Sequence, residues 1–120
     1  MNITHTRFVT VPVSDQDRAK QFYAGTLGFE VVADHQMGPV RWLGVAPKGE
    51  RTYFVLASES MGFTPGTVRG TMLVTSSLDA DCAELRAAGV EVEGPVEQPW
   101  GRQATLKDPD GNAFVLTEES

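Results

Sequence analysis

The chain of 120 residues is 41% hydrophobic, which fits one domain that buries its own core. Its single cysteine excludes an internal disulfide, and its formal net charge of −6 opposes binding to nucleic acid or anionic lipid, because phosphate contacts depend on Lys and Arg. No apolar run reaches the roughly 20 residues of a membrane helix and no signal-peptide pattern opens the chain, so we expect a cytoplasmic protein.

The first half of the chain predicts the element order βαβββ. Residues 8–13 alternate between two faces as a strand does, and Ser14 and Asp15 offer N-cap oxygens for a helix that ends at Gly28. Strand-like segments follow at about 29–34, 40–46 and 52–57. The Gly-, Ser- and Pro-rich residues 58–67 form the predicted linker.

The second half of the chain predicts the same order. A strand at about 69–75 precedes a helix that runs from Leu78 through Cys82 and Leu85 to Ala88. Gly89 is its predicted stop, because glycine readily takes the backbone conformation that ends a helix. Short strands are expected near 90–93, 102–107 and 113–118.

Two sequence matches indicate that the halves are repeats. Residues 28–31 (GFEV) recur 61 residues later as 89–92 (GVEV), and residues 54–56 (FVL) recur 60 residues later as 114–116. We therefore predict an α+β fold with two βαβββ repeats, at about 1–57 and 68–120, in one domain with a cupped eight-stranded mixed sheet. One helix covers only one face of each repeat's strands, so the uncovered faces are expected to enclose a cleft, the default ligand site.

Three motifs occur in a fixed order along these repeats. They are Asp15–Tyr23 leading to Leu27–Val31, then Leu85–Val90, then Asp108-Pro109-Asp110-Gly111-Asn112 before the last strand. Together they resemble the glyoxalase/bleomycin-resistance/extradiol-dioxygenase superfamily, also called vicinal oxygen chelate, over essentially the whole chain. The resemblance implies the paired βαβββ fold and a homodimer. It leaves the activity open, because the superfamily includes isomerases, dioxygenases, thiol transferases and drug-binding proteins.

The resemblance also implies where a metal would be bound. Metal-dependent members carry their ligands at the positions matched here by Phe8, Val55, Gly70 and Val115. These side chains offer no lone pair to a divalent ion, so neither a metal nor another cofactor is predicted, and metal-dependent isomerase or dioxygenase chemistry is not expected. His5 and His35 are expected at the surface or an interface, with His35 near a loop, and Cys82 is expected in the core. No catalytic residue is assigned.

Apolar and aromatic side chains are what the predicted cleft offers to a ligand. The expected ligand-binding residues are Phe8, Trp42, Tyr53, Val55, Met72, Trp100, Arg102 and Val115. Two of these, Val55 and Val115, could equally only fill the core. Trp100 lies in a loop between Pro and Gly, and planar ligands stack on such rings while cations rest on their faces.

We therefore predict a metal-independent protein that sequesters a planar, largely apolar and optionally cationic small molecule, as bleomycin-resistance-like proteins do in antibiotic binding and self-resistance. Two alternatives remain open. A metal-free lyase or isomerase could use Tyr53, Arg102 or groups of its substrate, and a metal-dependent glyoxalase or dioxygenase could use relocated ligands. The identity of the ligand, the pathway and the dimer geometry, including a domain swap through the linker, are not encoded in these patterns.

Overall fold

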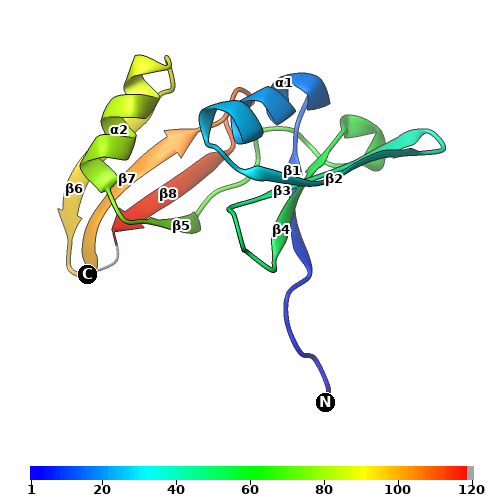
Figure 1. The fold of residues 1–120 in the computed structure, drawn as a ribbon, viewed down its shortest axis with the longest axis horizontal. Helices are drawn as coiled ribbons and strands as arrows, with labels where there is room; N and C mark the ends of the chain where they lie inside the picture. The colour runs from blue at the N-terminus through cyan, green and yellow to red at the C-terminus, as the bar shows by residue number, and fades with distance from the viewer. Residues whose placement is uncertain (119–120) are drawn as a thin grey trace. The chain divides into compact units, whose positions relative to one another are not determined.

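The computed structural model describes residues 1–118 and confirms the order βαβββ in both halves (Figure 1). The first half contains β1 (Phe8–Pro12), α1 (Gln16–Lys20), the π-helical η1 (Gln21–Thr26), β2 (Glu30–Met37), β3 (Val40–Ala46) and β4 (Tyr53–Ala57), followed by the short 3₁₀-helix η2 (Glu59–Met61). The second half contains β5 (Thr71–Thr75), α2 (Leu78–Ala87), β6 (Val92–Gln98), β7 (Gly101–Lys107) and β8 (Ala113–Glu118).

The chain divides into two compact units, unit 1 (Met1–Pro65) and unit 2 (Gly66–Ser120). The boundary between them falls inside the predicted linker, residues 58–67. The predicted second repeat extends to residue 120, and its last two residues lie outside the described part of the chain.

Each unit has its own four-stranded mixed sheet, with the strand orders β1-β4-β3-β2 and β5-β8-β7-β6. In both units the first strand is parallel to the last, and the remaining pairs are antiparallel. The predicted α+β fold with two βαβββ repeats is confirmed. The single eight-stranded sheet is wrong, because the hydrogen-bonded neighbours of every strand come from its own unit, so the strands form two sheets of four.

The first helix begins where the sequence predicts. Asp15 is its N-cap, and the Oδ1 atom of that residue accepts a hydrogen bond of 3.0 Å from the backbone N–H of Arg18. α1 continues directly into η1, and Gly28 follows with a φ of +74°, in the left-handed region that favours glycine. Phe22 and Tyr23 are buried between this helical segment and the sheet of unit 1.

The second helix has a narrow apolar stripe. Leu78, Cys82 and Leu85 are buried at helical spacing, which confirms the predicted core position of the cysteine. Burial raises the pKa of the Cys82 thiol, so the reactive thiolate is disfavoured.

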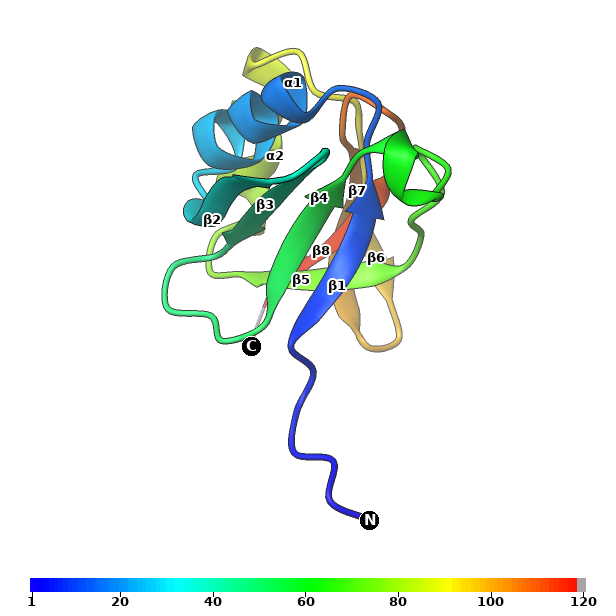
Figure 2. The same ribbon diagram turned by 90° about the vertical axis from the view of Figure 1, so that its right-hand side faces the viewer.

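In Figure 2 the helix of unit 1 lies over β2 and β3. No helix among residues 1–118 is long and apolar enough to cross a membrane.

The Asp108–Asn112 motif forms a buried turn before β8. The Oδ1 atom of Asp108 accepts backbone hydrogen bonds of 2.9 Å from Asp110 and from Asn112. The side chain of Asn112 in turn accepts a hydrogen bond of 3.1 Å from the backbone N–H of Val68, ahead of β5. The motif is therefore explained by turn formation, because its polar groups satisfy one another in the protein interior.

Two strands extend further than predicted. β2 continues past residue 34 to Met37, and β6 continues past residue 93 to Gln98. The Gly-Pro pair in β6 signals a break, but the ladder with β7 tolerates it through a register shift between Glu93 and Val96. His35 consequently lies within the strand, directly opposite Trp42, and three residues before the turn at Gly38. Its side chain is exposed, as expected.

Candidate ligand-binding site

One arginine in each unit identifies which sheet face carries the helix. In unit 1 the Nη1 atom of Arg41, on β3, lies 2.7 Å from the Oδ1 atom of Asp17 on α1. In unit 2 the Nη2 atom of Arg102, on β7, lies 2.8 Å from the Oδ1 atom of Asp79 on α2. Side chains alternate along a strand, so the residues adjacent to these arginines lie on the opposite face. We call that opposite face the open face of each unit.

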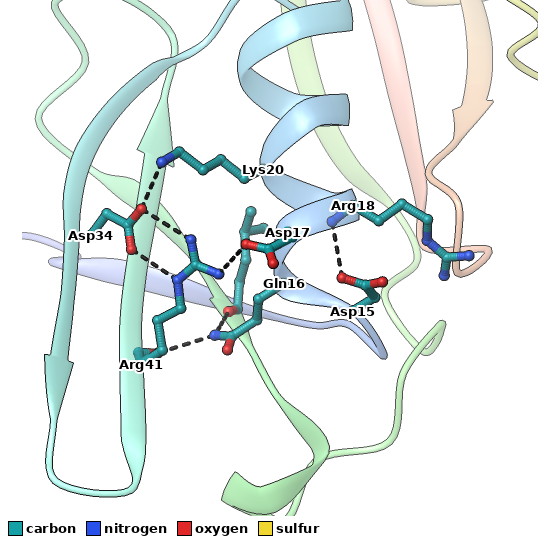
Figure 3. Close-up of polar contacts among 8 residues, drawn as sticks. Asp15, Gln16, Asp17, Arg18, Lys20, Asp34 and Arg41 are labelled. Atoms are coloured by element: carbon teal, nitrogen blue, oxygen red, sulfur yellow. Dashed lines mark hydrogen bonds and ion pairs between the residues drawn. The ribbon is translucent and has the colours of Figure 1, made fainter.

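The helix-bearing face of unit 1 holds a charged network around Arg41 (Figure 3). Its guanidinium also contacts Asp34 of β2, with 2.9 Å between Nε and Oδ1, and the Nζ atom of Lys20 lies 2.7 Å from the other oxygen of that carboxylate. The hydrogen bonds from Arg41 and Lys20 hold the pKa of Asp34 well below its usual range. The side-chain amide of Gln16 donates to the backbone oxygens of Arg41 and Leu56, which ties α1 to β3 and β4.

Arg102 occupies the corresponding place in unit 2. Besides Asp79, it lies within 3.5 Å of Glu97 on β6 and 3.8 Å of Glu118 on β8. Its guanidinium lowers the pKa of Asp79 by a hydrogen bond. These partners hold Arg102 on the helix-bearing face, so the structure does not bring it together with the open-face residues of the predicted site. The sequence contained the signal, because Arg102 follows Arg41 by 61 residues, the offset of the repeat.

Three of the predicted residues meet on the open face of unit 1. The ring of Phe8 lies 5.2 Å from the ring of Trp42 in an edge-to-face arrangement and 5.7 Å from the ring of Tyr53, measured between centroids. All three side chains are half-buried, so each ring combines fixed packing with accessible surface. Val55 lies on the same face, but it is 1% exposed and therefore belongs mainly to the core.

Gly44 makes room for this aromatic cluster. A Cβ atom on Gly44 would lie 2.9 Å from the Cδ2 atom of Tyr53, closer than packed carbon atoms approach. The Tyr53 ring therefore covers the position where a side chain on β3 would stand. The sequence reasoning did not identify this glycine as part of the site, because a glycine inside a strand signals only that something approaches closely.

The equivalent positions of unit 2 carry side chains of different size. Thr105 is the counterpart of Gly44, because each lies opposite the valine of the last strand of its unit. Ala113 is the counterpart of Tyr53, since each directly precedes the phenylalanine of a repeated FVL stretch. A large ring beside a glycine in unit 1 thus corresponds to a small side chain beside a threonine in unit 2.

The open face of unit 2 combines aliphatic and polar side chains. Met72 is directly opposite Val115, and the methionine is 48% exposed. Trp100 lies at the turn between β6 and β7 with 65% of its surface exposed, which matches the predicted loop position. Its Nε1 atom donates a hydrogen bond of 2.8 Å to the Oε1 atom of Gln103. Sequence reasoning missed Gln103, although its place next to Arg102 on β7 puts it on the open face.

The positions that the resemblance assigns to metal ligands do not fit a divalent ion. Phe8 and Val55 lie on the open face of unit 1, Val115 lies on that of unit 2, and Gly70 directly precedes β5. None of these side chains has an oxygen, nitrogen or sulfur atom to donate. Within residues 1–118, no group of three or more His, Cys, Asp or Glu side chains is placed to hold a metal ion.

Sequence comparison identifies the class of protein that this fold defines. A profile of the Glyoxalase/Bleomycin resistance protein/Dioxygenase superfamily matches residues 2–116. The chain therefore belongs to this superfamily, and the resemblance inferred from the motifs is confirmed.

Individual relatives match over nearly the whole chain. The solved structure of TnmS3, an antibiotic binding protein from Streptomyces sp. CB03234, is 49% identical, with a TM-score of 0.93 and coverage of 100% of this chain and 99% of that chain. The solved structure of UcmS2 is 34% identical, with a TM-score of 0.87 and coverage of 97% of this chain and 98% of that chain. YetH, an uncharacterized protein of Bacillus subtilis (strain 168), is 38% identical, and the match covers 92% of this chain and 94% of YetH.

Proposed function

We propose that this protein binds a planar, largely apolar antibiotic and sequesters it without chemical change. The observation that carries the proposal is the similarity to TnmS3 over all of this chain at 49% identity. The aromatic cluster on the open face of unit 1 supports it independently, because stacked and edge-to-face rings are suited to flat ligands. The net charge of −6 also makes a cationic group on the ligand acceptable.

We assign the ligand contacts to the open faces of the two units. In unit 1 they are Phe8, Trp42 and Tyr53, with Val55 as support beneath them. In unit 2 they are Met72, Trp100 and Val115. Arg102 is left out of this set, because its ion pairs with Asp79, Glu97 and Glu118 hold it on the helix-bearing face.

We further propose that the protein acts in the cytoplasm as a homodimer. Subcellular fractionation tests the location, and analytical ultracentrifugation tests the oligomeric state.

Two features support binding rather than catalysis. The metal-ligand positions of the superfamily hold Phe, Val, Gly and Val, which cannot polarise a substrate through an ion. The burial of Cys82 raises the pKa of its thiol, which disfavours its use as a nucleophile. A metal-free lyase or isomerase would have to use Tyr53 or the substrate's own groups, since Arg102 is held by three carboxylates.

A fluorescence screen of polycyclic aromatic antibiotics tests the proposal. A bound flat ligand should quench the emission of Trp42 and Trp100, and chromatography after prolonged incubation should recover that antibiotic unchanged. Steady conversion to product would show an enzyme instead. Elemental analysis of the purified protein tests the metal-dependent alternative, which a stoichiometric divalent ion retained after dialysis would establish.

Replacing the exposed indole tests the assigned contacts. Trp100→Ala should weaken binding of a confirmed antibiotic roughly 5- to 150-fold, because a stacked ring contributes about 1–3 kcal/mol. Its effect on the melting temperature should be small, since 65% of the Trp100 surface is exposed. Phe63→Ala is the matched control, because Phe63 is also exposed but lies in the predicted linker. Unchanged affinity in Trp100→Ala would remove Trp100 from the site.

A further inference from the structure

The side chains of Trp100 and Gln103 form a pair whose orientation is fixed by chemistry. The Nε1 atom of Trp100 lies 2.8 Å from the side-chain amide of Gln103. An indole N–H can only donate a hydrogen bond, so the amide atom that faces it is the oxygen. The Nε2 group of Gln103 must therefore point away from the indole nitrogen, with both of its hydrogens directed elsewhere.

In its row across the open face of unit 2, the Gln103 side chain has one hydroxyl-bearing neighbour and two aliphatic ones. Gln103 lies directly opposite Thr117 of β8 and Val96 of β6, and Val74 of β5 completes this row across the open face of unit 2. The hydroxyl of Thr117 donates a hydrogen bond of 3.2 Å to the backbone oxygen of Arg102. Within the described residues, the Nε2 group of Gln103 has no hydrogen-bond partner. The face thus presents one oriented donor beside an exposed indole ring.

We propose that the Nε2 group of Gln103 donates a hydrogen bond to an uncharged acceptor oxygen, such as a ring carbonyl, on the edge of a planar ligand that lies against Trp100. This inference rests on the proposed function and names the chemical class of ligand for the same site. A ligand edge that carries only hydrogen atoms would leave the amide unpaired on desolvation, which costs affinity. Gln103 is neutral, and the acidic chain disfavours a carboxylate, so the matching acceptor is a neutral carbonyl.

A pair of planar probes isolates the proposed hydrogen bond. 9-Fluorenone and fluorene share one flat tricyclic skeleton, and only the former carries a carbonyl oxygen. Equilibrium dialysis of the full-length protein gives the Kd of each probe, and quenching of tryptophan emission reports their binding. We expect the native protein to favour fluorenone, expressed as the ratio of the fluorene Kd to the fluorenone Kd.

Three variants then separate the possible outcomes. Gln103→Glu keeps an acceptor for the Trp100 indole but removes the donor, so the ratio should fall roughly threefold to tenfold with little change for fluorene. Trp100→Phe keeps an aromatic ring but removes the indole N–H that orients the Gln103 amide. The ratio should therefore fall by less than it does in Gln103→Glu. Gln21→Glu makes the same chemical change at an exposed helical position and should leave the ratio unchanged.

Each result bears on one claim. An equal ratio in the native protein and in Gln103→Glu would overturn the donor role of Gln103 while leaving the binding function intact. Failure of both probes and of every polycyclic antibiotic to bind would overturn the proposed function itself. Folding of each variant is checked by circular dichroism and thermal unfolding, and Gln103→Met provides a second, uncharged removal of the donor for which the same fall is expected.

Discussion

Unit 1 carries three aromatic rings in contact on its open face, whereas the equivalent positions in unit 2 hold small or polar residues. When the two FVL stretches are matched, Phe8 corresponds to Gly70, Trp42 to Gln103 and Tyr53 to Ala113. On the helix-bearing faces the units remain alike, with an arginine of the third strand joined to an aspartate in the first turn of the helix. The two units therefore share this ion pair on their helix-bearing faces and differ in the side chains of their open faces.

The largest effect should come from the repeated phenylalanines on the helix-bearing faces. Phe114 is fully buried, and Phe54 is 8% exposed and stacks on Phe29 with 6.2 Å between ring centroids. Phe114→Ala and Phe54→Ala should each lower the free energy of unfolding by about 3–5 kcal/mol, because each leaves a cavity. Chemical denaturation measures the loss. A cost below about 1 kcal/mol in only one unit would show that the two helix-bearing faces are not equivalent in energy.

Filling the space above Gly44 should have the next largest effect. Gly44→Ala places a methyl group against the Tyr53 ring, and we expect a loss of about 1–3 kcal/mol in the free energy of unfolding. In a Tyr53→Ala background, Gly44→Ala should lower the free energy of unfolding clearly less, because the ring that crowds the new methyl group is gone. The double variant then resembles unit 2, where Thr105 and Ala113 occupy the two positions. A double-mutant cycle measures the coupling. Strictly additive losses would mean that the ring does not occupy that space in solution.

The two arginines should contribute unequally. Arg41 and Asp34 have side chains only 23% and 22% exposed, and the arginine binds two carboxylates at 2.7 and 2.9 Å. Arg41→Met should lower the free energy of unfolding by about 1 kcal/mol, since the network is partly shielded from water. Arg102→Met should have a smaller effect, because its partner Asp79 is 73% exposed. Urea titrations of both variants check the ranking, and a larger loss for Arg102 would reverse it.

The smallest effect should be a pH dependence centred on Asp34. Its pKa in the folded protein is lowered by Arg41 and Lys20, so the charged carboxylate stabilises the fold at pH values above the ordinary Asp pKa of about 3.9. That contribution declines as the pH falls below about 4, toward the lowered folded pKa. The stability difference between the native protein and Asp34→Asn should therefore shrink from pH 7 to pH 3. A difference that stays constant across this range would exclude the linkage.

Much of the fold was predictable because its signals are local. The repeated motifs, the cap at Asp15 and the glycine stop at Gly28 specify elements through nearby residues alone. The full lengths of β2 and β6 were not predictable in this way. Pairing with a partner strand decides whether β2 continues past residue 34 and whether β6 continues through its Gly-Pro pair. Tertiary pairing overrides local turn signals in such segments.

The candidate site was harder to predict than the fold. Strand alternation placed Tyr53 on the same side of its strand as Val55, and the structure brings Phe8 and Trp42 to the same face. It did not exclude Arg102, whose assignment depends on the position of a helix that is distant in sequence. The orientation of the Gln103 amide depends on one hydrogen bond from a turn residue, which no pattern of residue types reveals.

The parallel pairing of β1 with β4 has a consequence for synthesis of the chain. Every ladder of the sheet in unit 1 joins residues between Phe8 and Ala57, so its hydrogen bonds require nothing from unit 2. A growing chain can therefore complete the first sheet while the second is still being translated, as N-terminal units generally do. The backbone ladders of the first sheet are therefore complete in sequence before any strand of the second sheet is translated.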